Sequence, residues 1–140
     1  MSTINQIQQE IVEEFEFFDQ WMDKYEYIID LGKKMPLIDE QFKHEENLVP
    51  GCQSRVWLHA ELENDRVNFS ADSDAIITKG IIALLIRVLS GQPLEDIKNA
   101  DLYFIDKIGL KEHLSPTRSN GLVNMVAKIR SIANSLASLH

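Results

Sequence analysis

The sequence has few cysteines and prolines and no long hydrophobic run, and each shortage excludes a class of protein. Its 140 residues include one cysteine, Cys52, so the chain can form no internal disulfide and no zinc site of cysteines. Four prolines and six glycines are too few for a disordered or fibrous chain. No stretch reaches the roughly 18 apolar residues of a membrane span, and residues 1–21 lack the pattern of a signal peptide. We therefore expect a cytoplasmic protein.

Positive charge is also in short supply, and this shortage limits the kinds of partner. The chain has 14 Lys and Arg against 22 Asp and Glu, which gives a formal net charge of −8. Such a surface repels phosphate backbones and anionic lipids, so we expect no binding to nucleic acid or to membranes. The length and the ordinary globular composition predict a single domain over residues 1–140 with one hydrophobic core.

Two amphipathic helices are predicted at the start of the chain. Apolar residues recur every three or four positions over residues 4–18, and Thr3 with Gln6 fits a capping box. A second helix is predicted from a cap at Asp19 to about residue 31, where Gly32 ends it. The two helices are expected to be close neighbours.

A β-hairpin is predicted directly after the cysteine. Residues 54–62 alternate between apolar and polar side chains, and residues 66–71 do the same after a turn at 63–65. No period holds over residues 33–51, where we expect an ordered loop that leads directly to Cys52. A hairpin of this size is not stable alone, so helices must pack on it.

The rest of the chain is predicted to be helical. Asp72, Ser73 and Asp74 offer caps for a helix over residues 75–90, which is apolar on nearly every side and must be central and buried. Further helical stretches are expected at residues 93–99, onward to about 110, and from a cap at Ser115-Pro116. The fold class is therefore α+β, and the periodicity shows no strand beyond the hairpin.

The thiol follows Pro50-Gly51, at a predicted turn just before the first strand. A lone cysteine is either a small buried side chain or a reactive thiol, and the residues alone leave both interpretations open. A reactive thiol needs a lowered pKa, for which Arg55 and Arg118 are the candidate cations. A thiol without a second thiol beside it also suits a sulfur carrier, because a neighbouring thiol would release the sulfur of a persulfide.

Hydrolase chemistry at the thiol would require a histidine base held by a third group. The four candidates are His44, His59, His113 and His140. None has a diagnostic spacing from the cysteine. His59 falls on the polar face of its strand and His140 is the last residue, so we interpret both as solvated surface histidines.

Three sequence blocks carry a more specific signal than the lone thiol. They are LVPGCQSRVW around the cysteine, ADSDAIITKG at the central helix and HLSPTRSNGL at the start of the last helix. In this order and spacing, and together with WMDKYEYIIDLGKKMP, they closely resemble the SufE family of cysteine desulfuration proteins. The resemblance implies a fold shared with IscU-type scaffolds, in which helices cover a small antiparallel sheet and the active cysteine lies in a loop at one end.

The resemblance also implies a function and a set of partners. Cys52 would accept persulfide sulfur from a SufS-type cysteine desulfurase, stimulate that enzyme, and pass the sulfur to a SufBCD-type scaffold for iron–sulfur clusters. In this scheme PLP belongs to the desulfurase, and the carrier has no cofactor, no metal and no independent turnover. By position in the blocks, Gln53, Asp74 and Arg118 are implied as supporting residues, although Asp74 is equally typical of a helix cap.

A different class of function stays open beside the carrier. An adaptor or scaffold protein could bind a desulfurase without carrying sulfur itself, and it would work normally after replacement of the cysteine by serine. A scaffold that holds the cluster would need several ligands, which one cysteine does not supply. The sequence leaves open whether the chain forms a homodimer and whether the thiol is exposed at rest.

Overall fold

The computed structural model describes residues 2–139, which form seven α-helices and a three-stranded antiparallel sheet of order β1-β2-β3. Two short 3₁₀ turns, η1 and η2, lie in the loop before the sheet. In chain order the elements are α1 (Ile4–Glu16), α2 (Trp21–Lys34), η1 (Glu40–Phe42), η2 (Glu45–Asn47), β1 (Val56–Glu63), β2 (Arg66–Ser73), α3 (Ile76–Leu89), β3 (Gln92–Pro93), α4 (Leu94–Asn99), α5 (Phe104–Lys107), α6 (Leu110–His113) and α7 (Pro116–Leu139). The predicted α+β class, with helices around a small sheet, is confirmed.

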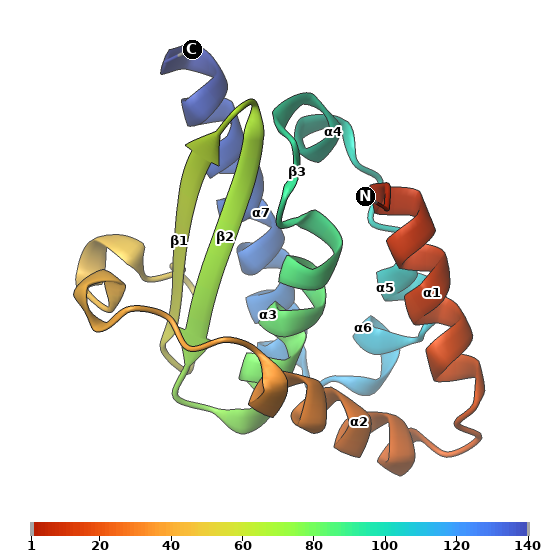
Figure 1. Cartoon of the computed structure of the whole chain (residues 1–140). Helices are drawn as coiled ribbons and strands as arrows, with labels where there is room; N and C mark the ends of the chain where they lie inside the picture. Colours follow the sequence, from red (N-terminus) through yellow and green to blue (C-terminus); the bar gives the residue numbers. More distant parts are fainter. Residues whose placement is uncertain (1, 140) are drawn as a thin grey trace.

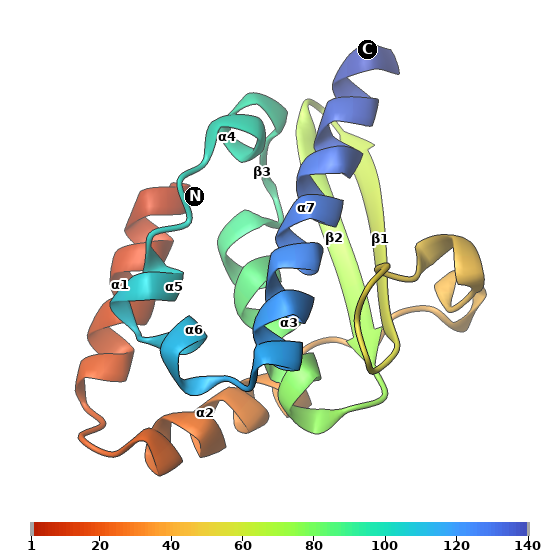
Figure 2. The ribbon, with the colours of Figure 1, turned by 180° about the vertical axis from the view of Figure 1, so that it is seen from behind.

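The central helix α3 organises the molecule. It lies between the β1–β2 hairpin on one side and α1 with α2 on the other, and α7 runs alongside it behind the sheet (Figures 1 and 2). Ten of its fourteen residues are buried, as an all-round apolar helix requires. The predicted central position is therefore confirmed. A continuous apolar core joins residues from all the major elements, including Phe15, Ile28 and Leu58.

The two N-terminal helices differ from the prediction at their ends. The capping box is present, because the Gln6 N–H donates to Thr3 Oγ1 and the Thr3 N–H donates to Gln6 Oε1. The predicted cap at Asp19 is wrong, since Gln20 precedes α2 and makes no side-chain cap. The helix also continues past Gly32, where a Cβ would lie 2.7 Å from the backbone nitrogen of Gly80. This glycine therefore serves close helix packing, which a local pattern does not distinguish from a helix end.

The hairpin forms as predicted. Strands β1 and β2 pair from Val56 opposite Ser73 to Glu63 opposite Arg66, and the turn residues have φ values of 52° and 65°. Positive φ at both turn positions matches the right-handed twist of a hairpin. The two residues, Asn64 and Asp65, are of types that tolerate positive φ better than most. The third strand, β3, has only two residues and pairs with the start of β2. Two residues are too few to show a period, and so the sequence did not reveal it.

The residues expected to cap α3 have other roles. Asp72 and Ser73 belong to β2, and the residue before α3 is Ala75, which makes no side-chain cap. The Asp74 carboxylate instead accepts a hydrogen bond of 3.0 Å from the Arg55 N–H. The cap interpretation of these three residues is therefore wrong, because cross-strand and loop contacts occupy their side chains.

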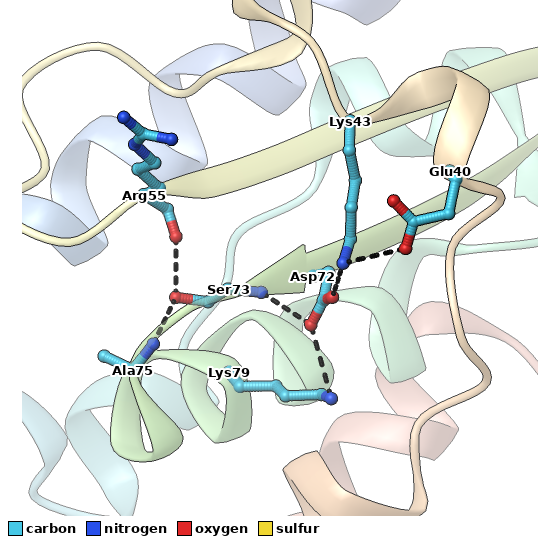
Figure 3. Close-up of polar contacts among 7 residues, drawn as sticks. All are labelled: Glu40, Lys43, Arg55, Asp72, Ser73, Ala75 and Lys79. Atoms are coloured by element: carbon cyan, nitrogen blue, oxygen red, sulfur yellow. Dashed lines mark hydrogen bonds and ion pairs between the residues drawn. The ribbon is translucent and has the colours of Figure 1, made fainter.

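The long loop before β1 is ordered by contacts with the outer part of the sheet. Phe42 stacks on His59 with ring centroids 3.6 Å apart, and Lys43 reaches Asp72 at 2.8 Å (Figure 3). His59 is thus half-buried beneath a ring, and the expectation of a solvated histidine is wrong for this residue. The alternation placed His59 on the polar face correctly, but it could not show that a loop covers that face.

The C-terminal part of the chain contains three short helices, α4 to α6, before the long helix α7. Gly109 has a φ of 75° and separates α5 from α6; the stretch expected to run to about residue 110 ends at Lys107, and α6 was not predicted. The predicted start of α7 is confirmed, because the Arg118 N–H donates to Ser115 Oγ and Pro116 occupies the first turn. Between residues 2 and 139, the structure contains no helix long and apolar enough to cross a membrane.

Candidate functional site

A pocket of about 270 Å³ lies beside Cys52, between the start of α3, the first half of α7 and the loop before β1. Its lining residues are Cys52, Gln53, Ser54, Ala75, Thr78, Ile81, Thr117, Arg118, Gly121 and Met125. Three of the four residues implied by the sequence therefore meet at one pocket, although they are as many as 66 positions apart (Cys52 to Arg118). The fourth, Asp74, does not line it.

The turn that carries the thiol is tight before Cys52 and held by hydrogen bonds after it. Gly51 has a φ of 79°, a backbone conformation that favours glycine, and a Cβ there would lie 2.3 Å from Asn124 Nδ2 on α7, so that side chain would have to move. After the thiol, the Arg55 N–H donates to Asp74 Oδ1, and the Arg55 carbonyl accepts from the Asp74 N–H at 3.2 Å. The Ser73 hydroxyl donates to the same carbonyl at 2.8 Å (Figure 3). Asp74 is thus placed to fix the loop that carries the thiol.

The thiol itself is half-buried and uncharged at rest. Its Sγ donates to the Gly121 carbonyl oxygen at 3.6 Å, a contact weaker than an ordinary hydrogen bond. Burial raises the pKa of Cys52 above its ordinary value, because a charged sulfur would lose solvation there. Burial, and not a nearby cation, is therefore the cause of the shift in the resting protein.

The two candidate cations explain why the pKa of the thiol is not lowered. Arg118 lines the pocket, but its Nη1 donates to the Tyr25 hydroxyl on α2 at 2.9 Å. Arg55 is exposed and does not line the pocket; its backbone, rather than its guanidinium, holds the loop. Gln53 lines the pocket with an exposed side chain, at its solvent side.

A buried carboxylate supports the sheet next to the site. Asp72, 7% exposed, accepts hydrogen bonds or ion pairs from Lys43 at 2.8 Å, Lys79 at 3.3 Å and the Ser73 N–H at 2.8 Å (Figure 3). Burial alone would raise the pKa of Asp72, but these donors outweigh it and hold the pKa below its ordinary value. The carboxylate therefore joins the loop before β1 to the end of β2 and the first turns of α3.

The geometry provides neither a histidine base nor a metal site in the part of the chain that the structure describes. None of its histidines lines the pocket: His59 stacks on Phe42, and His113 stacks on Trp21 with centroids 4.4 Å apart. His140 lies outside the described residues. Over residues 2–139, no three His, Cys, Asp or Glu side chains are grouped so that they could hold a metal ion.

Sequence reasoning missed the hydroxyl groups of the pocket. Ser54 Oγ and Thr78 Oγ1 lie 3.2 Å apart, and both residues face the same pocket as the thiol. One signal was present: Thr78 is the polar exception among the buried residues of α3. Gly121, whose carbonyl contacts the thiol, was also missed, since glycine near the start of a helix has no distinctive pattern.

Comparison with known proteins agrees with the three sequence blocks. The SufE family, described as "Fe-S metabolism associated domain", matches residues 9–133. An uncharacterized SufE-like protein of Rhizobium etli is 43% identical over 129 residues, which cover 89% of this chain and 87% of that protein. A second, from Rhizobium meliloti, is 42% identical over 129 residues, covering 89% of this chain and 92% of that protein.

Two further similarities concern a longer protein and a solved structure. SufE-like protein 1 of Arabidopsis thaliana, named chloroplastic/mitochondrial, is 44% identical over 119 residues. The matched residues cover 84% of this chain but 32% of that longer protein. The solution structure of a hypothetical protein from Thermus thermophilus has a TM-score of 0.77 at 20% identity, covering 94% of this chain and 96% of the other. The latter shows the fold alone. Taken with the family match over most of its length, these findings show that the chain belongs to the SufE family, whose domain is associated with iron–sulfur metabolism.

Proposed function

We propose that this chain is a sulfur carrier that holds sulfane sulfur on Cys52 as a persulfide. The donor is a SufS-type cysteine desulfurase, and the acceptor is an iron–sulfur cluster scaffold of the SufBCD type. The observation that carries the proposal is the position of the only thiol beside a pocket, in a turn flanked by the Val49–Val56 and Asp74–Arg55 backbone hydrogen bonds. The family's association with iron–sulfur metabolism supports it.

The proposed chemistry is two thiol–persulfide exchanges. In loading, the Cys52 thiolate attacks the terminal sulfur of the donor's persulfide; a new S–S bond forms, the donor's S–S bond breaks, and the donor cysteine leaves as a thiolate with the electron pair. In unloading, a thiolate of the acceptor attacks the terminal sulfur on Cys52 in the same way. The sulfane sulfur keeps its oxidation state throughout, so neither step needs an oxidant or a reductant.

The resting geometry favours protection of the thiol over spontaneous reaction. The half-buried thiol has a raised pKa, so little thiolate is present near neutral pH. We assign the stabilisation of the Cys52 thiolate during loading to Arg118, the one cationic side chain among the residues found to line the pocket. Arg118 lies in the first turn of the 24-residue helix α7, where the helix dipole adds to the positive potential. Gln53 is proposed as a contact for the incoming partner, and Asp74 as the residue that positions the loop.

The carrier proposal is tested by the mass of the protein and by the rate of a partner enzyme. Wild-type protein is incubated with a PLP-dependent cysteine desulfurase and cysteine, and reductant is then added to one portion. We expect the mass of one added sulfur on Cys52 in samples taken before reduction, and faster sulfide release with reductant. Cys52→Ser should lose both effects, and Arg118→Ala should slow loading by about tenfold if its charge is worth one pKa unit at the sulfur.

The controls separate the carrier from an adaptor. Far-UV circular dichroism verifies that each variant is folded, and wild-type protein alkylated at Cys52 serves as a chemically blocked match for Cys52→Ser. Normal stimulation of the desulfurase by Cys52→Ser would reject the carrier in favour of an adaptor. An unchanged loading rate in Arg118→Ala would reject only the role given to that residue.

A further inference from the structure

The hydroxyl pair in the pocket has an unused proton. Ser54 Oγ donates to Thr78 Oγ1 at 3.2 Å, which uses one of the two hydroxyl protons. Within residues 2–139 the structure offers no protein acceptor for the other one. Thr78 is 7% exposed and lines the pocket from the start of α3. A buried, uncommitted donor therefore borders the space next to the thiol.

The proposed persulfide must place a second sulfur somewhere in this space. An S–S bond puts that atom about 2 Å beyond Sγ. The terminal sulfur of a persulfide is more acidic than a thiol, because the neighbouring sulfur stabilises the negative charge. The resting thiol donates its proton toward the Gly121 carbonyl oxygen. A negatively charged terminal sulfur cannot take that position, because the sulfur and the carbonyl oxygen would repel each other. The pocket, at about 270 Å³ against the roughly 30 Å³ of a water molecule, has room for the sulfur instead.

The other walls of the pocket narrow the choice of donor. Ala75, Ile81 and Met125 offer no hydrogen-bond donor from their side chains. Gln53, Thr117 and Arg118 are exposed, and the Arg118 guanidinium also donates to Tyr25. Thr78 is the one buried hydroxyl-bearing residue of the lining, and its hydrogen bond with Ser54 leaves one proton of the hydroxyl pair available to the pocket.

We propose that the Thr78 hydroxyl, oriented by Ser54, donates a hydrogen bond to the terminal sulfur of the Cys52 persulfide. Thr78 is thus a positioning residue that favours the charged, loaded state of the carrier. The inference rests on the proposed function, because it requires a persulfide at Cys52. It also predicts that the hydroxyl has little effect on the unloaded thiol, which points at Gly121 instead.

The test compares the loaded and unloaded states of isosteric variants. Cys52 is loaded with inorganic polysulfide, the mass confirms one added sulfur, and the rate of alkylation by iodoacetamide is followed from pH 5 to 10. In Thr78→Val, we expect the pH midpoint of persulfide alkylation to rise by about one unit. A shift of that size corresponds to the loss of one hydrogen bond to a charged group. The midpoint for the unloaded thiol should not move. Thr78→Ser should restore the wild-type midpoint, and Ser54→Ala should raise it by less than Thr78→Val does.

Each outcome decides between the proposals. An unchanged persulfide midpoint in Thr78→Val, or an equal shift for persulfide and thiol, would overturn the role of Thr78, since an equal shift indicates only a change in packing. If Cys52 gains sulfur from polysulfide but never from a desulfurase, the donor in the proposed function is wrong while Thr78 is still tested. If Cys52 gains no sulfur from either source, both proposals are overturned.

Discussion

At the scale of single residues, the main finding is that the thiol is protected at rest. A reactive cysteine was expected to need cations that lower its pKa, and Arg118 does line the pocket. Desolvation dominates in the free protein and raises the pKa of Cys52, while Arg118 is engaged with Tyr25. This arrangement suits the proposed carrier, because an uncharged, half-buried thiol reacts slowly with small electrophiles in solution.

The space around the sulfur predicts the effect of Gly121→Ala. A Cβ at this position would lie 3.6 Å from Cys52 Sγ, an ordinary van der Waals contact, so the variant should fold. Alanine within a helix should raise the free energy of unfolding by about 0.5–1 kcal/mol, as measured by urea denaturation. The added methyl group restricts movement of the sulfur, so the rate of alkylation of Cys52 should fall several-fold. Ser131→Ala, exposed on the same helix, is the matched control, and a rate equal to that control would contradict this prediction.

At the scale of elements, α2 and α3 approach each other closely at two glycines. A Cβ on Gly80 would lie 2.1 Å from the Ile28 carbonyl oxygen, and one on Gly32 would lie 2.7 Å from the Gly80 nitrogen. Both neighbours are backbone atoms, which cannot move aside as a side chain can. Small residues at this crossing let the two helices approach closely and fix α3 against α2. The start of α3, which forms one wall of the pocket, depends on this position.

This crossing predicts a large loss of stability in Gly80→Ala. The extra methyl group must push α2 and α3 apart, so the free energy of unfolding should fall by about 3 kcal/mol despite the better helix propensity of alanine. Urea denaturation followed by circular dichroism measures it. Gly121→Ala is the control, because it makes the same chemical change where space is available. A loss in Gly80→Ala of less than about 1 kcal/mol would show that the helices separate easily.

At the scale of the whole molecule, an ionic contact ties three helices together on the side away from the pocket. Arg87 of α3 makes two hydrogen bonds to the Glu14 carboxylate of α1, at 2.8 and 2.5 Å, and the Tyr27 hydroxyl of α2 donates to the same carboxylate. The hydrogen bond from Arg87 lowers the pKa of Glu14, burial opposes it, and Tyr27 lowers the pKa further. The packing of these helices therefore depends on a charged carboxylate.

This contact predicts a stability that depends on pH through Glu14. Its folded pKa lies below the ordinary value of 4.5, so the stabilisation is present above about pH 4.5 and is lost as the pH falls through the folded pKa. Glu14→Gln should lower the free energy of unfolding by about 1 kcal/mol at pH 7, a value reduced for partial exposure of the pair. In urea denaturation, the difference from wild type should shrink at pH 3. Glu16→Gln, an exposed neighbour, should show no such pH dependence, and an equal loss at both pH values would contradict the role of the charge.

The residues near one another in the chain determined much of the fold. The capping box at Thr3, the hairpin turn, the apolar pattern of the central helix and the start of the last helix at Pro116 all formed as predicted. Each of these features depends on contacts within a few positions or on a repeating period, so it can be predicted from the sequence without a structure. The sequence blocks around Cys52 also led to the family, since they lie in a fixed order along the chain.

The tertiary structure decided the features that depend on distant partners. The acidic residues before α3 looked like helix caps, yet Asp72 binds lysines from a loop and a helix, and Asp74 binds the backbone of Arg55. The two-residue strand β3 has meaning only beside β2. The sequence alone thus identified Cys52 as the candidate thiol, whereas its burial, its raised pKa and the Thr78 hydroxyl in its pocket came from the fold. Periodicity shows which face of an element is buried, but only packing determines what covers that face and how charge is solvated there.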